Sequence, residues 1–224
     1  MISENLQEVQ QEIQDSCALV SRSSQDVTLI AVTKTVDAET TRVLVSEGVT
    51  HLAENRADKL LAKKAEMEDC QNLSWHFIGN LQRRKVKSVI NEIDYFHALD
   101  SVKLANEIQK RAEKVIKCFI EVNVSGEESK QGIRPEELDE FVEQLASFDQ
   151  VLVVGLMMMA PYDSTQEEQH QLFARLKTLQ EKIQSKHLSY APCTETSMGM
   201  SNDFGIAIQE GATFVRVGTA LFKG

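Results

Sequence analysis

The sequence lacks any hydrophobic run long enough to cross a membrane. Its longest apolar stretch, VLVVGLMMMAP at 151–161, is about half the roughly 20 residues that a spanning helix needs. The opening MISENLQEVQQEIQ has neither the basic start nor the apolar core of a secretory signal peptide. We therefore expect no membrane association and a cytoplasmic location.

Positive charge is also scarce. The chain has 24 Lys and Arg against 34 Asp and Glu, so its formal net charge is −10. This balance disfavours nucleic-acid binding, which depends on a broad basic surface. It remains compatible with one small anion held in a local pocket.

Cysteine and histidine patterns typical of metal sites are absent. The four cysteines, Cys17, Cys70, Cys118 and Cys193, form no CxxC pair, which favours a reducing compartment. The five histidines include no HExxH and no pair at metal-ligand spacing. We predict no metal site.

Short apolar segments alternate with polar segments of helical spacing along the chain. Residues 1–24 predict a helix with Ser3 as its cap. Segments rich in β-branched or aromatic residues then predict strands, at 28–33, 50–53, 74–78, 95–99, 117–124, 151–156, within 190–197 and at 213–217. The segment within 190–197 has the weakest pattern, because it is polar and contains a proline.

Residues that begin or end helices separate these strands. Asp37 predicts the start of a helix that stops at Gly48, and Pro135 fits the first turn of another. Ser201 predicts the cap of a helix that ends at Gly211.

Eight strand-then-helix units predict an α/β protein, a (β/α)8 TIM-type barrel with an extra amino-terminal helix. We expect one domain over 1–224, with the helix at 1–24 and the barrel at 28–224. A doubly wound open sheet is the alternative. Both folds place ligands at the carboxyl ends of the strands, so the search for a site starts there.

Lys34 lies where the first predicted strand ends, in LIAVTKTV at 29–36. It could be a solvated surface lysine, a charge for an anionic ligand or a nucleophile. Two other segments bear on this choice.

Two glycine-containing segments predict a phosphate site. In TSMGMSND (196–203), Ser197, Gly199 and Ser201 precede a predicted helix, whose first amides are unpaired donors. In FVRVGT (214–219), Gly218 and Thr219 follow the last strand. Loops after strands 7 and 8 of such barrels frequently bind phosphate. Each segment alone could be an ordinary polar loop.

Arg216 lies within the last predicted strand. By the period of two, Phe214 and Arg216 share one face while Val215 and Val217 share the other. We expect Arg216 to point into the barrel, where it needs an acceptor. That acceptor is either a core carboxylate such as Glu121 or a ligand atom.

A strand-end amine, a phosphate site and an inward arginine together match pyridoxal 5'-phosphate (PLP). Its aldehyde suits a desolvated Lys34 as an imine, its phosphate suits the two loops, and its ring nitrogen suits a polar partner. A barrel for another phosphorylated metabolite is an alternative that needs no imine at Lys34.

Motifs along nearly the whole chain resemble those of the pyridoxal-phosphate homeostasis protein (YggS/PROSC-like) family. They are AVTKTV, AENRADK, WHFIGNLQRRK, IEVNVSGEESKQGI, GLMMMAP, SMGMSND and VRVGTALFKG. The resemblance implies a barrel related to the alanine racemase N-terminal domain, PLP held as a Schiff base, a role in intracellular vitamin B6 homeostasis, and no established catalytic activity.

The resemblance also implies roles for individual residues. Lys34 is the Schiff-base lysine, and Arg216 faces the pyridine nitrogen. Phosphate binding is assigned to Ser201, Gly218 and Thr219, with backbone around Met198 and Gly199. Asn55 approaches the ring, and His76 and Met157 line the pocket. The other interpretation of His76 is a core histidine paired with a backbone carbonyl, and that of the methionine run is core filling.

Two functions follow from these residues. The first is a non-catalytic PLP carrier, a monomer that delivers PLP to apoenzymes. The second is a small amino-acid racemase. A racemase needs a second acid–base group, for which Tyr162 is the only tyrosine we consider, and nothing in its neighbourhood marks it as activated. We favour the carrier.

Overall fold

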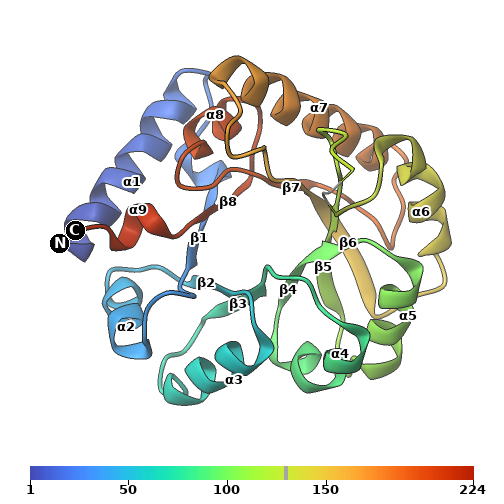
Figure 1. The fold of residues 1–224 in the computed structure, drawn as a ribbon, viewed down its shortest axis with the longest axis horizontal. Helices are drawn as coiled ribbons and strands as arrows, with labels where there is room; N and C mark the ends of the chain where they lie inside the picture. The colour runs from blue at the N-terminus through green and yellow to red at the C-terminus, as the bar shows by residue number, and fades with distance from the viewer. Residues whose placement is uncertain (129–130) are drawn as a thin grey trace.

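The computed structural model describes residues 1–128 and 131–224, and shows a closed barrel of eight parallel strands in sequence order. Helices surround the barrel (Figure 1). The predicted (β/α)8 fold with an amino-terminal helix is therefore confirmed. Residues 129 and 130, within the motif at 120–133, lie outside the described residues.

The strands are β1 (Thr28–Val32), β2 (His51–Glu54), β3 (Ser74–Phe77), β4 (Tyr95–Leu99), β5 (Ile116–Glu121), β6 (Val151–Met157), β7 (Glu195–Ser197) and β8 (Phe214–Val217). The α-helices are α1 (Ile2–Ala18), α2 (Ala38–Ser46), α3 (Ala57–Glu66), α4 (Arg83–Val89), α5 (Val102–Arg111), α6 (Leu138–Gln144), α7 (Gln166–Gln184), α8 (Phe204–Gln209) and α9 (Thr219–Phe222). Short 3-10 turns are η1 (Ser24–Asp26), η2 (Ile90–Glu92) and η3 (Pro135–Glu137).

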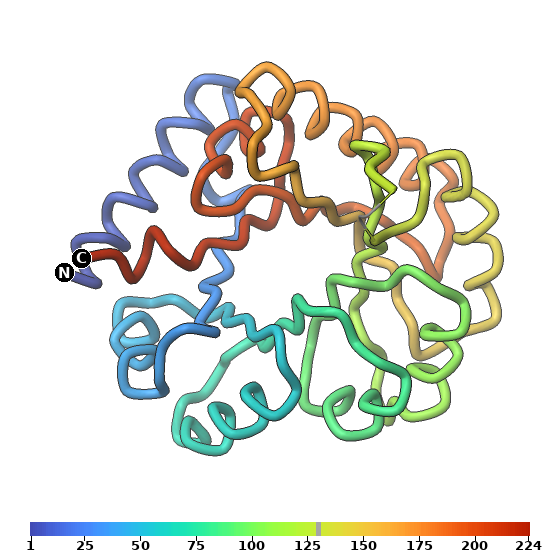
Figure 2. The backbone as a smooth tube through the Cα atoms, viewed as in Figure 1, coloured from blue at the N-terminus to red at the C-terminus, as the bar shows by residue number. Residues whose placement is uncertain are grey.

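The first and last strands close the barrel. β1 pairs with β8 in parallel, from Thr28 opposite Phe214 to Ala31 opposite Val217. The two chain termini lie together (Figures 1 and 2), where the Asn5 amide donates to the carbonyl oxygens of Leu221 and Lys223. The amino-terminal helix thus packs beside the carboxyl-terminal segment.

Two apolar layers form the core, one inside the barrel and one between the sheet and the helices. The inner layer contains buried side chains from facing strands: Ile30, Val32, Ala53, Phe119, Met157 and Phe214. Val215 and Val217 belong to the outer layer. The faces predicted for the last strand are therefore confirmed, because Phe214 lies inside the barrel and the valines pack outward.

The predicted helix boundaries are confirmed in part. Asp37 caps α2, accepting from the Thr40 N–H at 2.8 Å. However, α1 begins at Ile2 with Met1 as its cap, and the Ser3 hydroxyl instead donates to Glu47. The expected Ser201 cap is also wrong, because α8 begins at Phe204 with Asp203 at the cap position.

Two further boundaries differ from the predictions. β5 ends at Glu121, short of the predicted residue 124, because the chain there bonds to a later segment. Asn123 N–H donates to the Ile133 carbonyl and Ile133 N–H to the Glu121 carbonyl. Pro135 opens the 3-10 turn η3, which precedes α6.

Within the described ranges, the helices include none long and apolar enough to cross a bilayer.

We predict that Gly155→Ala lowers the free energy of unfolding by at least about 2 kcal/mol, because overpacking a rigid contact is costly. Gly155 in β6 pairs with Glu195 in β7, and a Cβ there would lie 2.0 Å from the Glu195 carbonyl oxygen. Urea unfolding followed by circular dichroism measures the change.

The control is Gly126→Ala, at an exposed glycine where a Cβ meets nothing within 4 Å. Its φ of +79° limits the expected cost to about 1 kcal/mol, the penalty of a left-handed backbone. Equal unfolding midpoints for the Gly155 variant and the unmodified protein would contradict the close β6–β7 approach.

Candidate functional site

Lys34 lies in the turn directly after β1, at the carboxyl end of the strand. Its side chain is exposed, so the desolvation expected from the sequence is not found. Within the described residues its ammonium forms no hydrogen bond or ion pair. Because Ile30 pairs with Arg216 across the β1–β8 seam, Lys34 leaves β1 at the end of the barrel where Gly218 and Thr219 leave β8.

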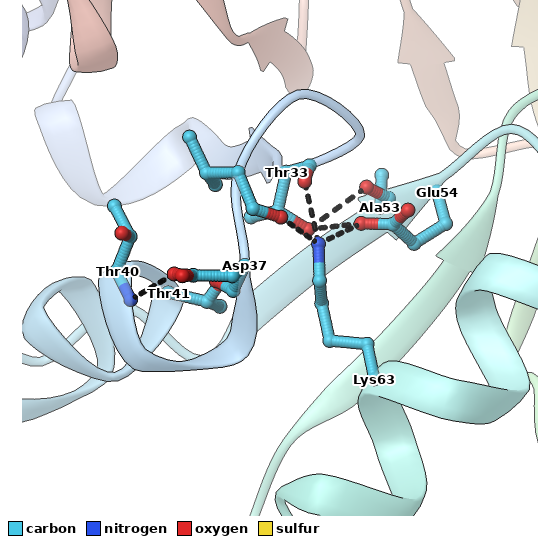
Figure 3. Close-up of polar contacts among 8 residues, drawn as sticks. Thr33, Asp37, Thr40, Thr41, Ala53, Glu54 and Lys63 are labelled. Atoms are coloured by element: carbon cyan, nitrogen blue, oxygen red, sulfur yellow. Dashed lines mark hydrogen bonds and ion pairs between the residues drawn. The ribbon is translucent and has the colours of Figure 1, made fainter.

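Lys63 of α3 fixes the turn that carries Lys34 (Figure 3). Its ammonium donates to the carbonyl oxygens of Thr33 and Val36, at 2.5 and 2.7 Å, and pairs with Glu54 Oε2 at 2.7 Å. Lys63 and Glu54 are both buried. Since Thr33 and Val36 flank Lys34 in the chain, the backbone on either side of the free amine is held in place.

Lys63 was not among the residues predicted for the site, although the sequence contains a signal for it. Lys63 shares helical spacing with Leu60 and Met67, and all three are buried. A lysine on the apolar side of a helix needs a buried partner. Glu54, the last residue of β2, is that partner.

The β7–α8 loop and the β8–α9 turn meet beside this end of the barrel. The Ser201 hydroxyl accepts from the N–H groups of Gly218 and Ala220, at 3.3 and 3.1 Å. Gly199 has a φ of +101°, a conformation that favours glycine. The Gly199 carbonyl accepts from the Arg216 N–H at 2.9 Å, which ties the loop to β8.

Unpaired backbone donors mark this junction as a fit for phosphate. In the part of the chain that the structure describes, the N–H groups of Ser201 and Thr219 have no protein acceptor. Thr219 is exposed and Ser201 is half-buried. Backbone N–H groups and hydroxyls are the donors that phosphate oxygens need, so these residues fit the phosphate predicted there.

We call Ser201, Gly218 and Thr219 at this junction the phosphate cradle. Ser197 and Met198 do not belong to it. Both are fully buried. The Ser197 hydroxyl contacts His97 and Arg216 inside the barrel, and the Met198 N–H donates to the Phe214 carbonyl at 3.1 Å. Their polar groups are therefore already used within the protein, which corrects the roles expected for them.

Arg216 points into the barrel, as predicted. Its Nη1 donates to the Ser197 hydroxyl and its Nη2 to the Met158 carbonyl at 3.0 Å. These two protein acceptors are neither of the alternatives considered from the sequence, which were a core carboxylate such as Glu121 and a ligand atom. Burial lowers the pKa of Arg216 to about 10, against the opposing effect of the Asp203 and Glu121 charges. The guanidinium thus remains charged at neutral pH.

The other predicted residues lie in three different places. Asn55 directly follows β2 and lines a cavity of about 210 Å³ with Phe77 and Asn80. Met157 is buried in the inner layer of the core, whereas Met159 is exposed. His76 is fully buried and bonds to two other histidines, so it neither pairs with a backbone carbonyl nor belongs to an exposed pocket wall.

A larger cavity, of about 500 Å³, lies at the same end of the barrel. Its lining includes residues after β5, β6 and β7: Asn123, Met159, Tyr162, Met200, Asn202 and Asp203. Neither cavity is lined by Lys34 or Thr219. The amine and the cradle are thus surface features beside the cavities.

Comparison with known proteins places the chain in a family. The model of the alanine racemase N-terminal domain matches residues 5–224. A pyridoxal phosphate homeostasis protein of Aquifex aeolicus is 41% identical over 222 residues, covering 98% of this chain and 96% of that protein. The homeostasis protein of Pseudomonas aeruginosa is 34% identical and covers 99% of this chain.

Comparison with solved structures supports the same family assignment. PipY of Synechococcus elongatus with PLP bound is 34% identical and covers both chains fully, with a TM-score of 0.86. Alanine racemase of Clostridium difficile shares the fold at a TM-score of 0.73, but it is only 17% identical and this chain covers 56% of it. The barrel and the full-length matches lead to one conclusion: this chain belongs to the pyridoxal phosphate homeostasis protein family.

Proposed function

We propose that this protein binds pyridoxal 5'-phosphate through Lys34 and serves intracellular PLP homeostasis as a non-catalytic carrier. The observation that carries the proposal is the Lys34 amine, which has no partner among the described residues and lies at the strand ends beside the phosphate cradle. Lys63 anchors the backbone on either side of Lys34, at Thr33 and Val36. A structure of the related PipY with PLP bound supports it.

Each group has a distinct part in binding. When bound, the cofactor would supply an aldehyde, and Lys34 Nζ would be the amine that holds it as a Schiff base. The Ser201 and Thr219 N–H groups and the Thr219 hydroxyl bind the phosphate. Asn55 approaches the ring, and Arg216 donates to the ring nitrogen. Because a guanidinium only donates and stays charged, it keeps that nitrogen unprotonated.

This arrangement favours carriage over catalysis. An unprotonated ring withdraws electrons weakly, which argues against transamination but allows racemisation. Racemisation needs a second acid–base group, and Tyr162 is 94% exposed, so water surrounds it rather than a site that orients it. At 17% identity, the solved alanine racemase structure shows a shared fold and does not by itself support racemase activity.

The exposure of Lys34 supports transfer of the cofactor to other proteins. An amine at the surface leaves the carbon–nitrogen bond accessible to attacking water or to an acceptor's lysine. We propose PLP-dependent apoenzymes as the acceptors. That the carrier is a monomer remains a prediction.

Lys34→Ala is expected to abolish the visible absorption band that the unmodified protein develops with PLP, because no other group in the proposed site supplies an amine. Reduction with borohydride should attach the cofactor covalently to Lys34, which peptide mass spectrometry locates. Lys59→Ala, at an exposed lysine of α3, is the control and should retain the band. A protein that takes up no PLP would favour the barrel for another phosphorylated metabolite.

Lys63→Met is expected to lower the free energy of unfolding by about 3–5 kcal/mol, because it leaves the buried Glu54 carboxylate without its ion-pair partner. It should also weaken PLP binding, since the turn at Lys34 loses its two anchors. Chemical denaturation and a PLP titration measure the two effects.

Lys64→Met is the matched control. Lys64 pairs with Glu92 at the surface, and such pairs contribute at most about 1 kcal/mol. The double variant Lys63→Met with Glu54→Gln should regain stability without regaining tight PLP binding. Unimpaired PLP binding by a folded Lys63→Met protein would contradict the anchoring role.

Incubation of the PLP-loaded protein with L-alanine or L-serine should produce no D-isomer above a protein-free PLP solution. Chiral chromatography measures the product. Substantial turnover that disappears in Lys34→Ala would replace the carrier with the racemase alternative.

A further inference from the structure

Three histidines and a serine form a continuous row of hydrogen bonds inside the barrel. His51 Nδ1 contacts His76 Nε2, His76 Nδ1 contacts His97 Nε2, and His97 Nδ1 contacts the Ser197 hydroxyl, each at 2.8 Å. We call these four residues the histidine chain. They come from β2, β3, β4 and β7, and the row ends at Arg216, which donates to Ser197.

The histidine chain connects two regions of the barrel. His51 is the first residue of β2 and is half-buried, whereas His76, His97 and Ser197 are fully buried. Ser197 is the last residue of β7. The row therefore begins at the amino-terminal end of the strands and leads to the ligand end.

Aromatic rings hold the two buried imidazoles in place. His76 stacks on Tyr95, with centroids 4.3 Å apart and planes 5° from parallel. His97 stacks on Phe119 at 4.4 Å and 19°. Since neither ring can turn without disturbing its neighbour, the nitrogens stay directed along the row.

The buried members of the chain are neutral imidazoles. Burial lowers the pKa of His76 and His97 well below the usual value. The Arg216 charge lowers the pKa of His97 further, and Lys117 and the neighbouring histidines act likewise on His76. A neutral imidazole has one N–H and one acceptor nitrogen.

This restriction couples the tautomers. Each contact needs one hydrogen, so the tautomer of one imidazole determines the tautomer of the next. Only two arrangements satisfy every contact. Either all three histidines carry the proton on Nε2 and Ser197 donates to His97, or all carry it on Nδ1 and His97 donates to Ser197.

Arg216 selects the first arrangement. A guanidinium only donates, so Ser197 must accept from Arg216. In the first arrangement the hydroxyl accepts from Arg216 and donates its one hydrogen to His97. In the second it accepts from both, and within the described residues its own hydrogen has no further acceptor. A buried unpaired hydroxyl is costly.

We infer that the histidine chain positions Arg216 by holding Ser197 as its acceptor, and so aims the guanidinium at the ring nitrogen of the cofactor. The inference rests on the function proposed above. His97 acts through Ser197 and Arg216 and touches no ligand, so it is a positioning residue. His76 and His51 fix the tautomer of His97.

The first test reads the tautomers in the unliganded protein. Nitrogen-15 spectra of the histidine side chains, assigned with single His variants, should show His76 and His97 neutral and protonated on Nε2. In His97→Phe, His76 should populate both tautomers, because its Nδ1 partner is gone. A proton on Nδ1 of His97, or a doubly protonated His76 at neutral pH, would overturn the inference.

The second test compares PLP with its carbocyclic analogue, in which carbon replaces the ring nitrogen. His97→Phe keeps the ring stack on Phe119, and it should weaken PLP binding about tenfold, the effect of one misplaced charge-assisted hydrogen bond. Binding of the analogue should not change. His97→Asn, whose amide can reach Ser197 in place of Nδ1, should restore most of the PLP affinity.

His170→Phe is the matched control, because His170 pairs with Glu210 and does not belong to the histidine chain. The affinities for PLP and for the analogue should both be unchanged. Equal losses for PLP and the analogue in His97→Phe, or no loss for PLP, would overturn the inference while the carrier function stands. A wild-type protein that binds neither ligand would overturn the proposed function and the inference with it.

Discussion

β1 and β8 lie side by side because the barrel is closed, and the ligand site depends on that pairing. The turn with Lys34 follows one of these strands, and Gly218 and Thr219 of the proposed phosphate cradle follow the other. The Lys34 amine and the Thr219 N–H, which are far apart in the sequence, are thus brought to one edge of the barrel. An open sheet ending in the same loops would leave them at opposite sides.

Two of the described cations, Lys63 and Arg216, are buried, and the fold satisfies them in different ways. Lys63 faces a carboxylate, Glu54, and its charge is neutralised within the protein. Arg216 donates to a hydroxyl and a carbonyl, which are neutral acceptors. Its charge is therefore only partly compensated, by more distant carboxylates. Lys63 thus supports the backbone of the turn at Lys34, whereas Arg216 is the cation that the proposed function assigns to the ring nitrogen.

The sequence-based predictions were most accurate where the pattern lies within a single strand, as alternation of inward and outward side chains. Alternation in FVRV was enough to place Arg216 inside the barrel, and the spacing of the strands was enough for the fold. The prediction that Ser201 caps a helix was wrong because a serine before a helix resembles a cap in the sequence. Its hydroxyl instead accepts from backbone N–H groups of the β8–α9 turn. The histidine chain was not predictable, because His51, His76 and His97 meet only through the stagger of three separate strands.

The closing of the barrel has a consequence for synthesis. Lys34 leaves the ribosome before β8, the strand that lies beside it, and before the Gly218–Thr219 turn. Because parallel pairing between distant segments forms late and slowly, a nascent chain holds Lys34 without the strand and the turn that lie next to it in the folded protein. The site proposed for the cofactor is therefore complete only after β8 has been made and has paired with β1.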